Sequence, residues 1–181
     1  MTVDSEIVGG AGTPDNFDRL WAPHRNAYLS GENRPLPGNE VPCPFCRVPT
    51  LSDSEGLIVA RGDLAYVVMN LYPYNSGHLL VCTYRHVADL TELLAEERNE
   101  ILKLSAHAMT VLRKVLSAKG FNLGMNQGAI SGAGIDEHIH QHVVPRWGGD
   151  SNFMPIIGQT KVMPQLLQET WSVLASNWNL V

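Results

Sequence analysis

The sequence predicts an α+β domain in which one long helix lies across an antiparallel sheet. Two observations lead to this prediction. Five short runs of apolar and β-branched residues are separated by turn-forming residues, and one much longer stretch has helical spacing. The order of these segments, with three strands before the helix and two after it, is typical of a helix packed on one face of a sheet.

The first three strand-like runs cover residues 57–60, 65–70 and 78–83. They are interrupted by Gly62-Asp63 and by the segment 73–77, which begins with proline and ends with glycine. Clusters of this kind end strands and form turns. We therefore expect a meander of antiparallel strands.

The longest helical pattern covers about residues 95–119. Its apolar residues recur at spacings of three and four, so they share one face: Ile101, Leu104, Ala108, Leu112 and Val115. Gly120 is predicted to cap the C-terminal end of this helix. Residues 121–126 and 138–145 are then expected to form two more strands, joined by a glycine-rich connection.

The terminal segments are predicted from weaker patterns. Residues 15–29 indicate a short amphipathic helix interrupted at Pro23, and the segment 30–42 indicates a loop rich in glycine, proline and asparagine. Residues 163–178 are expected to form a C-terminal helix with Pro164 in its first turn. We thus expect a single domain over residues 1–181, with three parts: an arm and loop at 1–42, a core at 43–160 and a terminal helix at 161–181.

Composition restricts the classes of function. A chain of 181 residues with 44% hydrophobic content can bury a full core. Its formal net charge of −5 argues against a nucleic-acid groove, although a small positive site for phosphate remains open. No apolar run approaches the roughly 18–20 residues of a membrane span, and the acidic start is unlike a signal peptide. We therefore expect a cytoplasmic protein that binds neither nucleic acid nor membrane.

The most informative motif is Glu-His-Ile-His-Gln-His-Val-Val-Pro-Arg at residues 137–146. In an extended strand alternate side chains point to the same face, so His138, His140 and His142 are expected to lie together. Imidazole can act near neutral pH as a nucleophile, a proton donor or a metal ligand. Three imidazoles in register therefore predict a chemical site better than they predict core packing.

These residues resemble the signature of the histidine triad superfamily of nucleotidyl hydrolases and transferases, in which histidines alternate with apolar residues. Gln141 departs from that pattern and is expected to be hydrated or hydrogen-bonded. The flanks at residues 70–81 and 145–153 look most like the bacterial diadenosine tetraphosphate phosphorylase branch. The resemblance spans about residues 43–171 and implies a sheet of about five strands, a long helix across it and a two-fold homodimer.

The resemblance also implies an activity. The middle histidine of the motif is the family's nucleophile, which makes His140 the residue expected to attack the α-phosphorus of a nucleotide. The backbone carbonyl of His138 would orient the His140 ring, and His142 would contact the phosphate and the departing oxygen. The leading expectation is phosphorolysis of diadenosine tetraphosphate to ADP and ATP. The alternatives are hydrolysis of dinucleoside polyphosphates or nucleoside phosphoramidates, sugar-nucleotide transfer, and non-catalytic nucleotide binding.

Several further residues are candidates for substrate binding. Asn70, Leu71 and Tyr72 match the family segment that frames ribose and base, although Leu71 and Tyr72 could equally be core residues. The glycine-rich segment 124–134 has the composition of a phosphate-cradling turn or of an ordinary loop, and its candidates are Asn126, Gln127, Gly128, Ser131, Gly132 and Gly134. Arg146 could hold a phosphate or end a strand in solvent, and Trp147 could stack on a second base or close the pocket from a neighbouring subunit.

Cys43 and Cys46 form a Cys-x-x-Cys pair that could bind one Zn²⁺ with two further ligands. His86 and His138 are candidates, and the galactose-1-phosphate uridylyltransferase branch of the superfamily has a zinc site with matching positions. The alternatives are buried thiols and a redox pair. Redox use is less favoured because the motif is not expected to open a helix. Four other residues are assigned no chemical role: Cys82 is expected in the core, and His24, His78 and His107 are expected to be structural.

Overall fold

The structure is a computed structural model that describes residues 43–150 and 165–181. The predicted N-terminal helix and loop at residues 1–42 lie outside the described residues, as does the segment 151–164. The division of the chain into an arm, a core and a terminal helix therefore stays a prediction.

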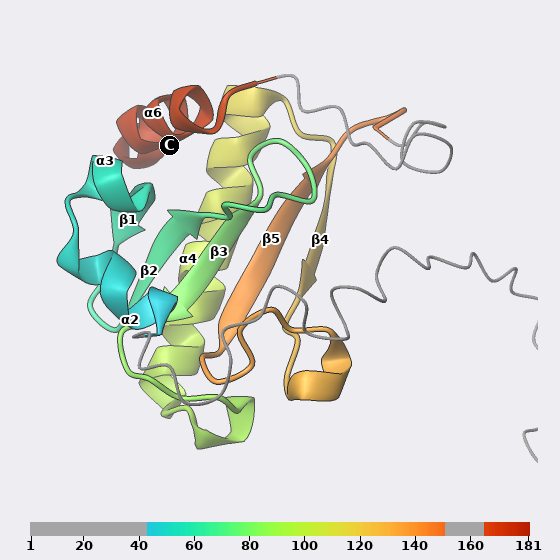
Figure 1. The fold of residues 1–181 in the computed structure, drawn as a ribbon. Coiled ribbons are helices and arrows are strands. Elements are labelled where there is room, and N and C mark those ends of the chain that lie inside the picture. The colour runs from blue at the N-terminus through green and yellow to red at the C-terminus, as the bar shows by residue number, and fades with distance from the viewer. Residues whose placement is uncertain (1–42, 151–164) are drawn as a thin grey trace, which may run out of the picture. The chain divides into compact units, whose positions relative to one another are not determined.

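A five-stranded sheet forms the centre of the fold (Figure 1). All neighbouring strands in it are antiparallel, and their order is β1-β2-β3-β5-β4. The strands are β1 (Ile58–Arg61), β2 (Ala65–Met69), β3 (Leu79–Thr83), β4 (Gly120–Gly124) and β5 (His140–Arg146). The predicted fold class is confirmed, and each predicted strand exists within a few residues of its expected position.

Helix α4 (Ala95–Leu116) packs across one face of the sheet, as predicted. In Figure 1 it runs behind β2, β3 and β5. Its apolar stripe meets the residues of the central strands that point to the same side, because Ile101, Ala108 and Leu112 lie in one buried cluster with Val81 and Val143. This helix-side cluster is the main hydrophobic core, and burial of such side chains contributes roughly 1.5–3 kcal/mol each.

The end of α4 was predicted wrongly. The helix ends at Leu116, and Ser117 takes the left-handed conformation with φ 55° that Gly120 was expected to supply. The reason lies in the sheet, where the Lys119 N–H donates to the carbonyl of Arg146 at 2.8 Å. Gly120 is consequently the first residue of β4.

The C-terminal helix α6 covers Leu167–Asn177 and is followed by a short 3₁₀ turn, Trp178–Leu180. The predicted start of this helix at residues 163–164 lies outside the described residues. Leu174 and Trp178 join the helix-side cluster, and the Trp171 indole N–H donates to the carbonyl of Ile58 at 2.9 Å. No helix in the described part of the chain is long and apolar enough to cross a membrane.

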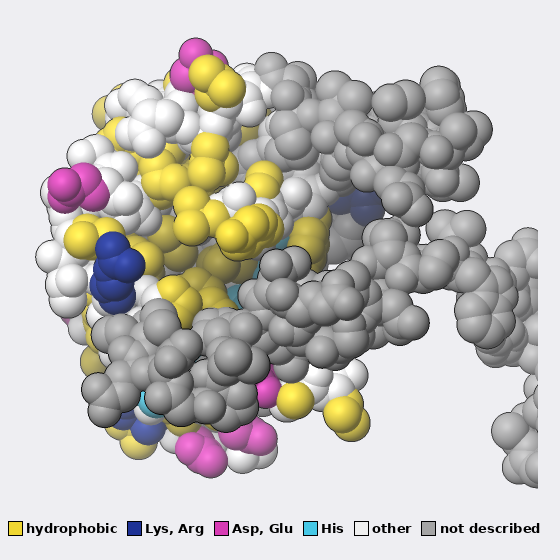
Figure 2. All heavy atoms as spheres, viewed as in Figure 1, with side chains coloured by type: hydrophobic (Ala, Val, Ile, Leu, Met, Phe, Trp, Pro, Cys, Tyr) yellow, Lys and Arg dark blue, Asp and Glu magenta, His cyan; other side chains and the backbone are white. Residues whose placement is uncertain are grey.

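Among the described residues, the other face of the sheet is covered near β1 and β2 by α2 (Pro44–Arg47), a 3₁₀ turn (Val48–Thr50) and α3 (Asp53–Gly56). A second buried cluster lies beneath them and includes Phe45, Tyr66, Leu80 and Cys82. Figure 2 shows this face, where hydrophobic side chains gather and histidine atoms are visible between them.

Candidate active site and metal centre

The register between β3 and β5 places the histidines on the face of the sheet opposite helix α4. Leu80 pairs with His142 and Cys82 pairs with His140, and directly opposite residues share a face. The strand begins at His140 rather than at His138 as predicted. The alternation nevertheless holds, because Ile139 and Val143 point into the helix-side cluster. Gln141 is buried, and its amide N–H groups donate to the carbonyls of Gly124 and His142, so the expected hydrogen bonding of this residue is confirmed.

His140 is held in one orientation by a backbone carbonyl. Its Nδ1 lies 2.8 Å from the carbonyl oxygen of His138. A carbonyl can only accept a hydrogen bond, so Nδ1 carries the proton and Nε2 keeps its lone pair. Burial lowers the pKa of His140, which favours the neutral ring. The side chain therefore has the protonation state and the orientation that a nucleophile needs.

The tautomer of His142 is fixed by a hydrogen bond with His78, a residue that was expected to be structural. The backbone N–H of Tyr74 donates to His78 Nδ1 at 3.0 Å, so this nitrogen must be an acceptor. His78 Nε2 then carries the proton and donates to His142 Nδ1 at 2.9 Å. His142 is left with its proton on Nε2, a buried atom with no hydrogen-bond partner among the described residues.

Burial, with a smaller contribution from His140, lowers the pKa of His142 to about 4. The ring is therefore neutral near pH 7, and its free N–H is a hydrogen-bond donor rather than a strong acid. His140 and His142 have ring centroids 4.9 Å apart. A phosphate group bound at these two rings would face the lone pair of His140 Nε2 and the N–H of His142 Nε2.

This depressed pKa predicts how stability depends on pH. In the unfolded chain His142 titrates near its ordinary pKa of 6.5, whereas in the folded chain it titrates near 4. Between these values the unfolded chain binds a proton that the folded chain does not, so the free energy of unfolding falls as the pH is lowered, by up to about 1.4 kcal/mol per pH unit. Urea unfolding should show that the wild type loses more stability than His142→Gln between about pH 7 and pH 5. Equal losses in the two proteins would contradict the buried neutral ring.

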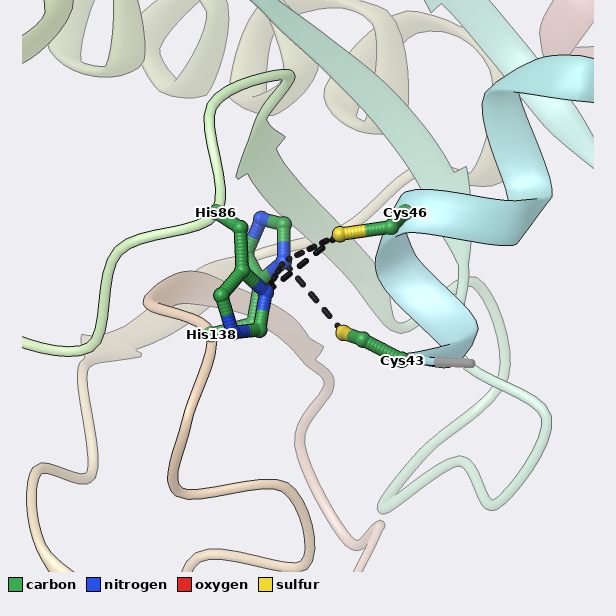
Figure 3. Close-up of side chains that lie close together, drawn as sticks. All are labelled: Cys43, Cys46, His86 and His138. Atoms are coloured by element: carbon green, nitrogen blue, oxygen red, sulfur yellow. Dashed lines mark hydrogen bonds between the residues drawn. The ribbon is translucent and has the colours of Figure 1, made fainter. Parts of the chain in front are cut away.

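Four metal-binding side chains meet at the edge of this site, as Figure 3 shows. Their ligand atoms all lie within 4.8 Å of one another: Cys43 Sγ, Cys46 Sγ, His86 Nδ1 and His138 Nδ1. The two imidazole nitrogens are 3.3 Å apart, and the sulfur–nitrogen distances are 3.3–3.5 Å. Bond lengths of about 2.05 Å to nitrogen and 2.3 Å to sulfur give tetrahedron edges of about 3.35 and 3.55 Å. The donor set and its spacing therefore fit a four-coordinate metal ion.

The orientation of His138 supports the same conclusion. Its Nε2 donates to the carbonyl of Thr83 at 2.9 Å, which leaves the Nδ1 lone pair facing the two thiols and His86. Hydrogen bonds of this kind fix the tautomer of metal-binding histidines. The predicted set of Cys43, Cys46, His86 and His138 is thus brought together by elements that lie far apart in the sequence.

One premise of the sequence analysis was wrong at this centre, because Cys43 does precede a helix. That helix, α2, is a single turn, and burial together with the neighbouring Cys43 raises the pKa of the Cys46 thiol. A redox cysteine needs the opposite shift, so the redox alternative is still not favoured. Cys82 is fully buried, as expected of a core residue.

The turn between the two cysteines also contacts the nucleophile. The Phe45 ring packs against His138 and His140, with centroid distances of 5.6 and 4.8 Å. The Tyr66 hydroxyl fixes this turn from below by donating to the Phe45 carbonyl at 2.7 Å. Phe45 therefore packs between the candidate metal site and His140.

The predicted ribose and base segment lies beside His142. Leu71 and Tyr72 are 65% and 85% exposed, which excludes the alternative that they belong to the core. Asn70 receives the Tyr72 N–H on its side-chain oxygen, and its amide nitrogen lies 3.3 Å from His78 Nδ1. Asn70 is thus held beside His78, and Leu71 and Tyr72 follow it in the chain with exposed side chains.

The glycine-rich segment before β5 forms a tight turn with few free side chains. Gly128 and Gly132 adopt φ values of 76° and 83°, which other residues rarely take. The Gln127 side-chain oxygen accepts from the Leu90 N–H, and the Ser131 hydroxyl donates to the Gly128 carbonyl. Asn126 is half-buried and Gly134 is exposed. Because the Gln127 and Ser131 side chains are already hydrogen-bonded, the backbone N–H groups of this turn are better candidates for binding a phosphate.

Arg146 and Trp147 both have partners within the chain. The Arg146 guanidinium makes two hydrogen bonds with Asp150, at 2.6 and 2.7 Å, and a third with Asn122, so a phosphate would have to displace them. The Trp147 indole donates to the Leu116 carbonyl at the end of α4 and packs against the helix-side cluster. The predicted roles of Arg146 in phosphate binding and of Trp147 in closing the pocket of a neighbouring subunit stay predictions.

The chain is similar to proteins of known families. The family described as the HIT domain matches residues 52–149. A Mycobacterium tuberculosis protein named AP-4-A phosphorylase is 47% identical over 172 residues, which cover 93% of this chain and 88% of the relative. The asymmetrical bis(5'-nucleosyl)-tetraphosphatase of Schizosaccharomyces pombe is 32% identical over 90 residues, which cover 50% and 49% of the two chains.

A solved structure has the same fold. A Zn-bound histidine triad family protein from Mycobacterium smegmatis superposes with a TM-score of 0.63 at 24% identity, covering 76% of this chain and 94% of that one.

Proposed function

The chain belongs to the HIT domain family, and from this premise we propose that it transfers an adenylyl group from diadenosine tetraphosphate to inorganic phosphate through His140. The observation that carries the proposal is the hydrogen bond from His140 Nδ1 to the His138 carbonyl, which leaves Nε2 free to attack. The choice of substrate and acceptor rests on the similarity to the M. tuberculosis protein named AP-4-A phosphorylase.

The reaction has two displacements. In the first, the lone pair of His140 Nε2 forms a bond to the α-phosphorus as the bond to the bridging oxygen breaks, so ATP departs and AMP remains on the ring. In the second, an oxygen of inorganic phosphate attacks the same phosphorus and the bond to nitrogen breaks, which gives ADP. The carbonyl of His138 stabilises the partial positive charge that the His140 ring acquires while it carries the nucleotide.

His142 is expected to act as a neutral hydrogen-bond donor to the phosphate and the departing oxygen. A polyphosphate leaves as a stable anion, because its ionisations lie near pH 6, whereas an amine must be protonated as it leaves. His142, with a pKa of about 4, is neutral near pH 7, so it can donate a hydrogen bond to a departing polyphosphate but is not protonated to supply a proton to a departing amine. This favours dinucleoside polyphosphates over phosphoramidates as substrates.

We also propose that Cys43, Cys46, His86 and His138 bind one zinc ion. The support is that the four ligand atoms lie within 4.8 Å of one another and that the nitrogen–nitrogen distance and three sulfur–nitrogen distances are close to the edges of a zinc tetrahedron. Zinc with four protein ligands has no open position for a water molecule, so its contribution would be structural. It would hold the Cys43–Cys46 turn, and with it Phe45, against the loop that carries His138.

The proposed assembly is a two-fold homodimer. Strand β4 lies at one end of the sheet, and its residues Asn122, Leu123 and Gly124 are exposed. Leu123 is 47% exposed, and an open apolar edge of this kind favours pairing with another strand. A monomeric mass in light scattering at micromolar concentration would contradict the dimer.

The proposed function predicts a phosphate-dependent product. Wild-type protein incubated with diadenosine tetraphosphate and phosphate should yield ADP and ATP in equal amounts, and omission of phosphate should slow consumption of the substrate strongly. Chromatography of the nucleotides measures both. AMP and ATP formed at the same rate with and without phosphate would instead show a hydrolase, the activity that the S. pombe relative's name describes. Nucleotide binding without turnover of any adenylated substrate would show a non-catalytic protein.

A further inference from the structure

The Tyr74 ring packs against His78 and His142, the histidine pair that would hydrogen-bond the leaving group. It lies in the loop between β2 and β3, and its ring is stacked on His142 with centroids 5.5 Å apart and planes at 18°. The same ring contacts His78 at 4.7 Å. Since Tyr74 is 51% exposed, one face of the ring shields the imidazoles while the rest meets solvent.

The backbone of Tyr74 acts on the same pair. Its N–H donates to His78 Nδ1, and the Asn70 side-chain amide lies 3.3 Å from the same nitrogen, so His78 Nδ1 is an acceptor and His78 Nε2 carries the proton that it donates to His142. In this tautomer His142 presents the Nε2–H, rather than a lone pair, to a negatively charged oxygen.

We propose that Tyr74 is a positioning residue for the departure of the leaving nucleotide, and that it acts by holding His78 and His142 so that the His142 Nε2–H faces the departing oxygen. The inference rests on the proposed nucleotidyl transfer through His140. The stacking contacts are made by the ring face, so a phenylalanine can replace Tyr74 and a small side chain cannot, whereas the backbone N–H is kept in either variant.

The loop has a second attachment that does not involve the Tyr74 ring. The Asn75 side-chain amide donates to the carbonyl of Pro145 at 3.0 Å and to Asp150 at 2.9 Å. Asp150 is in turn paired with Arg146. Loss of the Tyr74 ring should therefore leave the loop attached to β5 and the protein folded, while the two imidazoles lose the surface that restrains them.

The experiment compares Tyr74→Ala and Tyr74→Phe on two esters of AMP, the p-nitrophenyl ester and the phenyl ester. Both present the same nucleotide to His140, but phenolate is the more basic leaving group and depends more on a hydrogen bond from His142. We expect Tyr74→Ala to lower kcat on the phenyl ester about tenfold and on the p-nitrophenyl ester less than about twofold, with KM nearly unchanged. Tyr74→Phe should behave like the wild type on both.

A second readout is independent of activity. Nitrogen-15 NMR of the imidazoles should show the His142 proton on Nε2 in all three proteins, because Tyr74→Ala keeps the backbone N–H that fixes the tautomer, and should show exchange broadening of the His142 signal in Tyr74→Ala alone. The signal can be assigned by its loss in His142→Gln. Equal losses on the two esters, a change confined to KM, or a His142 signal in Tyr74→Ala as sharp as in the wild type would overturn the proposal, as would a Tyr74→Phe variant as impaired as Tyr74→Ala. Because release of the phenol is measured, the result does not depend on whether phosphate or water is the acceptor.

Discussion

Replacement of His140 by alanine is expected to abolish turnover of diadenosine tetraphosphate, with a loss of at least about 10⁴-fold in kcat. Among the histidines of the described site, His140 combines a lone pair on Nε2 with a fixed orientation, whereas His142 carries its proton on Nε2. The substitution therefore removes the nucleophile. The ring contributes mainly in the transition state, so binding of a nucleotide should stay within about tenfold of wild type. His140→Asn should be equally inactive, because the amide nitrogen cannot carry the nucleotide.

The matched control is another histidine of the same chain. His107 lies on α4 and donates to the carbonyl of Trp178, on the helix side of the sheet. His107→Asn should therefore lower stability slightly and leave kcat within about twofold. If His140→Ala retained turnover near the wild-type rate, the covalent route would be wrong. Nucleotide affinity measured by calorimetry separates a loss of chemistry from a loss of the fold.

The second large effect is expected at the metal centre. Cys43→Ser should lower the melting temperature by at least about 5 °C, because a ligand set that forms only in the folded chain adds its zinc-binding free energy to stability. Purified wild type should contain one zinc per chain by elemental analysis, and the variant should contain much less. His140 is intact in Cys43→Ser, so residual turnover below the melting temperature is expected.

A chelator provides the control for this prediction. It should lower the melting temperature of the wild type toward that of Cys43→Ser and leave the variant unchanged, because the variant has little metal to lose. Well under one zinc per chain in protein that was never exposed to chelator would contradict the site. Equal melting temperatures of the wild type and Cys43→Ser would do so as well.

The sequence predicted the parts of the fold and site that depend on short-range patterns. Alternation in the segment 138–145 placed the three histidines on one face, and the 3.6-residue spacing located α4. The cluster of four side chains that could bind a metal was predicted because Cys-x-x-Cys is a strong signal and because the family resemblance supplied His86 and His138. Each of these inferences needed only neighbouring residues or a matching motif.

The errors depend instead on pairing between distant segments. His78 was assigned a structural role because nothing in its neighbourhood shows that β3 lies beside β5, which is what brings it to His142. Its even-numbered position, in phase with Leu80 and Cys82, was the available signal. The partners of Trp147 and Arg146 were not predicted either: Trp147 donates to Leu116, which only the folded chain brings close, whereas Asp150 lies just four residues after Arg146. Gly120 was taken for a helix cap because its role in the sheet depends on β5.

The most direct test of the central claim is to follow labelled inorganic phosphate during turnover of diadenosine tetraphosphate by the wild-type protein. If the adenylyl group passes from His140 to phosphate, the label should appear in ADP at its β-position, with one labelled phosphate for each ADP formed and no label in ATP. His140→Ala should incorporate none. Formation of unlabelled AMP together with ATP, with the label remaining in free phosphate, would contradict the account.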